Sequence, residues 1–106
     1  MSYQQNTKLK PYTRIFASTD LSGTGIIDDI PEYNEFIVMV SASGFVSAHY
    51  ATKECLLNGP IFTSSYYYNE AQHGMATIQL YAGGAYQIAQ GLDQNSVDSS
   101  VAIYAR

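Results

Sequence analysis

Four carboxylates fall close together in the segment DDIPEYNE, residues 28–35. They are Asp28, Asp29, Glu32 and Glu35. Carboxylate oxygens at this density can hold Ca²⁺ if loop carbonyl groups complete the coordination shell. The spacing matches no EF-hand loop, and a solvated acidic loop has the same composition. We therefore expect no metal and no cofactor, and these four residues are the candidates if a cation does bind.

Few residues could support nucleophilic or acid–base chemistry. The chain has two histidines, His49 in SAHYA and His73 before Gly74, and one cysteine, Cys55 in KECLLNG. We predict that the histidines are ordinary polar residues and that Cys55 is a small buried hydrophobic residue beside two leucines. A lone cysteine forms no intrachain disulfide and no cysteine-based zinc site. The sequence also lacks a serine-hydrolase elbow and a phosphate-binding glycine loop. The expectation is a protein that is not an enzyme.

Three consecutive tyrosines, Tyr66, Tyr67 and Tyr68, stand out in a chain with ten tyrosines and no tryptophan. Side chains alternate between the two faces of a strand. We therefore predict Tyr67 on the opposite face from Tyr66 and Tyr68, with one of the two faces in the core. A tyrosine combines a rigid aromatic ring with a polar tip, which suits core packing, a subunit contact or a platform for a sugar. All three alternatives stay open.

Charge is scarce and unevenly distributed. Charged residues make up 13% of the 106 residues, about half of the ~25% that is usual. The basic residues Lys8, Lys10 and Arg14 lie near the N-terminus, whereas residues 15–105 carry nine acids against one base, a net charge of −8. Such a body repels phosphate, so we expect no nucleic-acid binding. No apolar run approaches the ~18 residues of a membrane span, and no secretory signal is present. We expect no contact with a membrane.

Apolar runs separated by turn signals predict short β-strands throughout the chain. The predicted strands are residues 12–18, 35–41, 45–52, 61–68, 75–82, 85–91 and 101–105. The predicted turns and loops include residues 19–25, 41–44, 53–60, 69–74 and 92–100. In the first strand, strict alternation places Arg14 and Phe16 on the same face. The run at 35–41 is apolar on both faces, which predicts a central strand covered on both sides.

These elements predict an all-β fold. Seven or eight short strands without a helix-length apolar period are typical of an antiparallel β-sandwich or a small jelly roll. Residues 1–11 are polar and lack an apolar period, so we expect an N-terminal arm, followed by one sandwich domain over residues 12–106.

The composition also favours assembly. Aromatic enrichment with charge depletion is typical of surfaces that other subunits cover. We expect a homo-oligomer, with a trimer favoured, in which Tyr66, Tyr67 and Tyr68 supply an interface or a ligand platform. The arm residues Lys8 and Lys10, with Arg14 at the arm's root, are expected to dock on an acidic neighbour.

Three segments carry a resemblance to a known class of proteins. IPEYNEFIVMV, GFVSAH and SVAIYAR resemble small β-sandwich tip domains of bacteriophage tail-fibre and virion accessory proteins, over residues 30–48 and 100–106. The resemblance brings no chemical residue with it. A fibre tip follows a long shaft, whereas this chain starts at Met1. The resemblance therefore implies a stand-alone virion protein, either a capsid decoration or a tail component, that is made in the host cytoplasm and attaches non-covalently to other virion proteins. The alternative is a carbohydrate-binding or lectin-like domain that recognises a host surface glycan.

Overall fold

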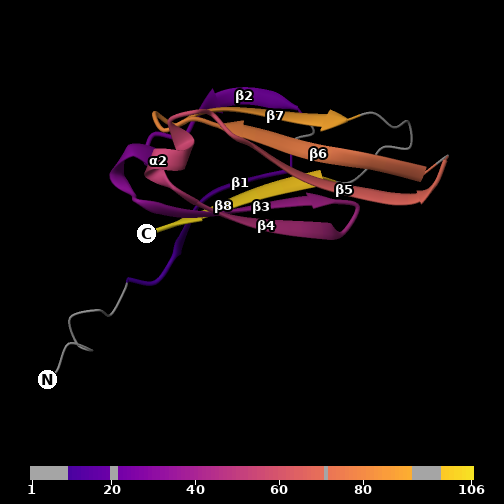
Figure 1. The fold of residues 1–106 in the computed structure, drawn as a ribbon, viewed down its shortest axis with the longest axis horizontal. Helices are drawn as coiled ribbons and strands as arrows, with labels where there is room; N and C mark the ends of the chain where they lie inside the picture. The colour runs from indigo at the N-terminus through magenta and orange to yellow at the C-terminus, as the bar shows by residue number, and fades with distance from the viewer. Residues whose placement is uncertain (1–9, 20–21, 71, 92–98) are drawn as a thin grey trace, which may run out of the picture.

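Two four-stranded antiparallel sheets pack face to face in the computed structural model (Figure 1), which describes residues 10–19, 22–70, 72–91 and 99–106. The first sheet has the strand order β1-β8-β3-β4, and the second has the order β2-β7-β6-β5. The predicted antiparallel β-sandwich or small jelly roll of seven to eight short strands is confirmed.

The elements follow the predicted turn signals closely. The strands of the first sheet are β1 (Thr13–Ser18), β8 (Ser99–Ala105), β3 (Glu35–Ala42) and β4 (Phe45–Thr52). Those of the second are β2 (Gly23–Ile26), β7 (Ala85–Gly91), β6 (Gln72–Leu80) and β5 (Ile61–Asn69). Two short helical segments, η1 (Ile30–Glu32) and α2 (Lys53–Leu56), lie at the same end of the sandwich, where the Lys53 ammonium donates to the Pro31 carbonyl oxygen at 2.6 Å.

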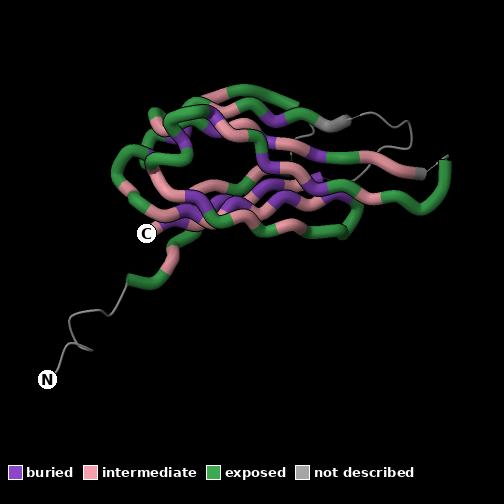
Figure 2. Tube along the Cα trace, in the orientation of Figure 1, coloured by how far each residue is buried: buried purple, intermediate pink, exposed green. Residues whose placement is uncertain are grey.

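The core lies between the sheets and follows the alternation of side chains (Figure 2). Successive residues of β3 and β8 alternate between buried and half-exposed positions. The inner faces of these two strands are therefore rows of aliphatic or aromatic residues, except for the buried Ser99 at the start of β8. The buried hydrophobic residues with no exposed surface are Ile30, Phe36, Val38, Val40, Ala42, Leu56, Ile78, Leu80, Ile103 and Ala105.

Two tight turns set the registers of the hairpins. Ser43 and Gly44 both have positive φ, 48° and 84°, as a type I′ turn requires, and they close the β3–β4 hairpin with Ala42 opposite Phe45. Gly84, with a φ of 99°, turns the chain between β6 and β7 as predicted. A side chain at Gly84 would clash with the backbone of Ile27, so this position needs glycine for space as well as for conformation.

Several local predictions were wrong. The predicted turn at 19–25 contains the start of β2, whose glycine-rich sequence pairs with β7. The predicted loop at 53–60 opens with α2, capped by the Thr52 hydroxyl, which accepts from the backbone N–H of Cys55. The predicted loop at 69–74 is shorter, because β6 already begins at Gln72. No helix among the described residues is long and apolar enough to cross a membrane.

The faces of β1 also differ from the prediction. A register shift between Arg14 and Phe16 breaks the strict alternation, so Phe16 packs against the core while Arg14 is exposed. The Phe16 ring lies 5.0 Å from the ring of Tyr86 between the sheets. A bulge of this kind leaves no signal in the hydrophobic pattern.

One prediction about β3 is wrong within this chain. The strand was expected to be covered on both faces, but only one face is buried, and Ile37 and Met39 remain half-exposed on the other. The apolar run is therefore central in its sheet but open on its outer side.

Candidate functional site

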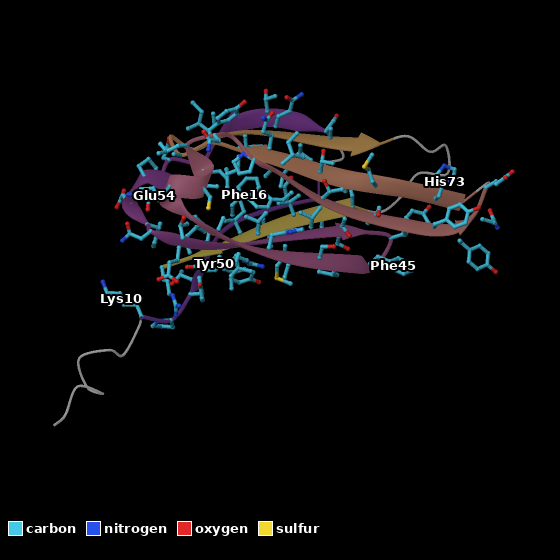
Figure 3. The ribbon with its side chains drawn as sticks, in the orientation of Figure 1. Lys10, Phe16, Phe45, Tyr50, Glu54 and His73 are labelled. Carbon is cyan, nitrogen blue, oxygen red and sulfur yellow. The ribbon has the colours of Figure 1, made fainter. Side chains whose placement is uncertain are left out.

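A charged cluster closes the end of the sandwich that carries η1, α2 and the C-terminal residue, here called the proximal end (Figure 3). Its centre is Glu35 Oε1, which accepts from Arg106 Nη2 at 3.1 Å, from Tyr50 OH at 3.2 Å and from Tyr12 OH at 3.4 Å. Arg106 also lies over the Tyr12 ring, 4.2 Å from its centroid. Three side chains from three separate parts of the chain thus donate to one carboxylate.

The cluster holds Glu35 in its ionised form. The hydrogen bond from Arg106 is the largest cause that lowers the pKa of the Glu35 carboxyl, and the phenol of Tyr50 adds to it. The pKa of Tyr50 is raised, first by burial and then by its hydrogen bond to Glu35. The arrangement is a hydrogen-bonded ion pair that anchors the C-terminal Arg106 to β3.

The candidate metal residues do not form a metal site in the described part of the chain. No three histidine, cysteine, aspartate or glutamate side chains there converge as a metal site would require. Asp28, Asp29 and Glu32 are exposed around η1, whereas Glu35 belongs to the ion pair with Arg106. The four residues are close in sequence, but their side chains do not converge on one point in the structure.

The tyrosine run lies at the opposite, distal end, on the β5–β6 hairpin. Tyr66 and Tyr67 take opposite faces, since Tyr66 packs against the core and Tyr67 is 68% exposed. Tyr68 does not join Tyr66 in the core, because the register shifts between Tyr67 and Asn69 and leaves Tyr68 76% exposed. One of the three rings is thus structural, and two are presented to solvent.

The distal end is built from aromatic contacts between the two hairpins. Phe45, which follows the β3–β4 turn, stacks on Tyr66 with 5.9 Å between ring centroids, yet it is still 58% exposed. The Ser64 hydroxyl donates to the Phe45 carbonyl oxygen at 2.5 Å and fixes the two hairpins together. Tyr67 lies 5.8 Å from the His73 ring across the β5–β6 pair. Figure 3 shows Phe45 and His73 at this end, away from Tyr50 and Glu54.

The outer face of the first sheet carries an apolar surface that the strand registers assemble from four strands. We call it the outer patch, and its residues are Ala17, Ile37, Met39, Val46, Ala48, Tyr50, Ala102 and Tyr104. Met39 lies at its centre, opposite both Ala48 and Ala102. Val46 and Tyr50 are 56% and 61% exposed. No charged residue falls within the patch, although Arg14 and Glu35 border it.

The outer face of the second sheet has a different character. Polar uncharged residues dominate its centre, where Thr77 and Gln79 of β6 lie beside Ala89 and Gln87 of β7. Together with Ile61 they line a shallow depression of about 200 Å³. The lining residues include no aromatic ring, so the depression lacks the stacking surface of a typical sugar site.

The remaining candidate residues take structural or exposed positions. Cys55 is exposed, which corrects the prediction that it is buried, because α2 turns it away from the core that Leu56 enters. A hydrogen bond from the Thr52 hydroxyl is the main cause that lowers the pKa of its thiol. His49 Nε2 donates to the Thr63 carbonyl oxygen at 3.1 Å and links β4 to β5.

The structure describes only part of the predicted arm. Lys8 lies outside the described residues, as do the other residues of segment 1–9. Lys10 is exposed, and its carbonyl oxygen accepts from Arg106 Nη1 at 3.3 Å. Arg14 is exposed on β1. The end of the arm is therefore tied to the proximal cluster through its backbone.

Sequence reasoning missed the two features that organise these surfaces. Arg106 and Glu35 are 71 positions apart and meet only because β8 pairs with β3. The outer patch had a signal, since residues 36–40 are all apolar and therefore place apolar side chains on both faces of the strand. No family model, curated protein or solved structure matches the chain.

Proposed function

We propose that this protein is a non-enzymatic structural or accessory subunit of a virion, a capsid decoration or tail component, that acts through protein–protein assembly. The observation that carries the proposal is the outer patch. A sheet face of a small soluble domain normally carries polar or charged residues on its solvent side, whereas this one carries Ile37, Met39, Val46 and Tyr50. An apolar face with charges only at its border is typical of a surface that another subunit covers.

The virion setting rests on the resemblance of residues 30–48 and 100–106 to tail-fibre tip and accessory domains. The protein would be made in the host cytoplasm and would then join the particle through contacts with copies of itself and with other virion proteins. The arm adds an electrostatic contribution, since Lys8, Lys10 and Arg14 complement the acidic body of a neighbouring subunit. Deleting residues 2–10 should weaken attachment at low salt more than at high salt. If the truncated protein attached as the full-length protein does at both salt concentrations, the arm would have no such role.

The experiment is a measurement of mass in solution over a range of concentrations. A single chain has a mass of 11.7 kDa, so a dimer, the expected trimer and larger assemblies are readily distinguished. Met39→Glu places a charge in the centre of the outer patch and should lower the mass by removing the contact through this face. Thr77→Glu is the matched control, because Thr77 is also half-exposed and faces outward from a central strand of the second sheet. A wild-type protein that remains a monomer up to high micromolar concentration would contradict assembly through this surface.

A second candidate function is recognition of a host surface glycan. The specific observation in its favour is the presentation of Tyr67 and Tyr68 at the distal end, since sugars stack on exposed aromatic rings. The candidate ranks second because the two rings and the polar depression on the second sheet do not share residues. Glycan-array binding that Tyr67→Ala and Tyr68→Ala abolish, with the mass unchanged, would favour this function over assembly.

A further inference from the structure

The two lateral sides of the sandwich are protected very differently. On one side the edge strands are β1, which is short, bulged and carries Arg14, and β2, which has four residues, two of them glycines. Short, bulged or charged edges prevent pairing with another chain. On the other side the edge strands are β4 and β5, with eight and nine residues, and neither contains lysine, arginine, proline or an acid.

The backbone of β4 can be assigned residue by residue. Glu35 and Arg106 exchange N–H···O bonds at 3.1 Å in both directions, so the odd residues of β3 bond to β8 and its even residues bond to β4. The bond from Lys53 N–H to the Asn34 carbonyl oxygen, 2.9 Å, continues the same alternation. The odd residues of β4 therefore bond to β3.

The even residues of β4 must then direct their backbone groups away from the sheet. These residues are Val46, Ala48 and Tyr50, and no strand of the first sheet lies on that side. The β3–β4 register runs through eight pairs without a bulge, so the free edge is straight. β5 contacts β4 from the second sheet through His49 and through Ser64, which leaves the edge of the first sheet open.

We propose that the free edge of β4 pairs antiparallel with the β4 edge of a second copy of this chain, around a two-fold axis at Ala48. The proposal rests on the proposed assembly function and adds a contact at the sheet edge to the one that covers the outer patch. Two copies of the first sheet then form one continuous eight-stranded sheet, and their outer patches become one surface. Ala48 lies opposite Ala48 of the second copy, and Val46 lies opposite Tyr50.

The sequence of β4 favours its own copy as the partner. A two-fold contact needs a strand that is complementary to its own reversed copy. In this register Ala48 pairs with Ala48 of the second copy. On each side Val46 pairs with Tyr50, and a β-branched residue beside an aromatic one is a favourable cross-strand combination. The strand carries no charge that would repel its copy. One strand alone would bury less than the ~800 Å² per partner of a stable interface. Because β5 lies along the same side, its uncharged edge adds to the contact area.

The stoichiometry follows from the symmetry. Two-fold pairing predicts an even number of copies, whereas the composition favoured a trimer. A mass of two chains, or of a multiple of two, supports the edge pairing. A trimer without higher species overturns it and leaves the assembly function in place.

Amide hydrogen exchange of the intact wild-type protein tests the pairing directly. We expect the amides of Val46, Ala48 and Tyr50 to exchange about tenfold or more slowly at a concentration where the protein is assembled than after dilution to monomer. Ser47 and His49 are the internal controls, because their amides bond to β3 and should be protected at both concentrations. Rapid exchange at the even positions of an assembled protein would overturn the edge pairing but not the assembly function. A monomer at every concentration would overturn both.

Substitutions give an independent test. Ala48→Pro removes the N–H that the pairing requires, and proline is tolerated on an edge strand where that N–H faces solvent. The dissociation constant of the assembly should rise about tenfold or more, since at least two hydrogen bonds are lost. Ala48→Ser keeps the N–H and should assemble as the wild type does.

Ala48→Lys and Ala17→Lys form a second pair, which covers the case in which the proline variant fails to fold. Both alanines are exposed on the outer face of the first sheet, but they lie on opposite edge strands. Loss of assembly only in Ala48→Lys supports pairing at β4. Equal loss in both variants would instead assign the contact to the open face of the sheet and overturn the edge pairing.

Discussion

The two ends of the sandwich use the same residue type in opposite ways. At the proximal end the hydroxyl groups of Tyr12 and Tyr50 donate to Glu35, and Arg106 lies over the Tyr12 ring. At the distal end Tyr67 and Tyr68 are 68% and 76% exposed on a hairpin that extends beyond the β3–β4 turn (Figure 1). The hydroxyl groups at the proximal end belong to a hydrogen-bonded anchor, although the Tyr50 ring is itself 61% exposed in the outer patch, whereas both distal rings lie outside that anchor and face solvent.

The difference shows that a count of tyrosines does not locate a functional surface. The proximal cluster satisfies its carboxylate and guanidinium within the chain, so those groups stabilise the fold and are not available to a partner. The distal rings and the outer patch gain nothing from exposure in a single chain, and a partner that covers them would be favoured by the apolar area removed from water. The surfaces to test are therefore the outer patch and the distal rings, which are exposed to solvent and are not covered by other parts of the described chain.

The largest effect should come from the packing that closes the proximal end. Leu56 of α2 has no exposed surface, and its carbonyl oxygen accepts from the N–H groups of Gly59 and Ala82. Leu56→Ala should lower the free energy of unfolding by about 2–5 kcal/mol, because it leaves a cavity in the core. Leu57→Ala is the matched control, since Leu57 is the next residue, of the same type, and 70% exposed. Its effect should stay within about 0.5 kcal/mol in urea denaturation. Equal effects in the two variants would mean that α2 does not close the core.

The tyrosine run should show a graded response at the distal end. Tyr66 is half-buried and stacks on Phe45, so Tyr66→Ala should cost about 1–3 kcal/mol, less than a fully buried aromatic residue. Tyr68→Ala should change stability by no more than about 0.5 kcal/mol, because its ring is largely in solvent. Thermal and urea denaturation of the two variants measure the difference. If Tyr68→Ala destabilised the fold as much as Tyr66→Ala, the division into one structural and two presented rings would be wrong.

Much of the fold could be predicted because its signals are local. The alternation of Ala76, Ile78 and Leu80 with polar neighbours indicated one buried face of β6, and the glycine pair at 83–84 indicated the turn that follows. The ends of β4 and β7 were predicted without error, since each strand is bounded by turn residues. Local patterns determine local structure wherever side-chain periodicity and turn chemistry agree.

The missed features depend on contacts between distant segments. Residues 23–26 are poor strand formers and become β2 because β7 offers an edge to pair with. The bulge in β1 is set by its register against β8, which brings Phe16 into the core. Cys55 is exposed because the first turn of α2 rotates it outward, and a four-residue helix has too short a pattern to predict. The pairing of Glu35 with Arg106 required the strand order itself.

The smallest effect, and the one that isolates the proximal anchor, is the pH dependence of Glu35→Gln. The folded-state pKa of Glu35 lies below its ordinary value of 4.5, chiefly because Arg106 donates to the carboxylate. A carboxyl whose pKa is lowered on folding contributes stability above the unfolded-state pKa, and this contribution is lost as the pH falls through the folded-state value. The melting temperature of the wild type should therefore exceed that of Glu35→Gln by a constant amount above about pH 5, and the difference should narrow at lower pH.

The Arg106→Gln background provides the control. Without the guanidinium, the main cause of the lowered pKa is gone. In the Arg106→Gln background, the melting temperatures of the proteins with Glu35 and with Glu35→Gln should therefore differ less, and the difference should depend less on pH. Added salt should reduce the difference in the wild-type background, because the pair is half-exposed and such pairs are screened. If the difference in melting temperature between the wild type and Glu35→Gln stayed the same from about pH 7 to pH 3, Glu35 would stabilise the fold through its hydrogen bonds and packing and not through its charge. The proximal end would then be held by contacts that do not depend on the charge of Glu35, such as those of Arg106 with the Tyr12 ring and the Lys10 carbonyl oxygen.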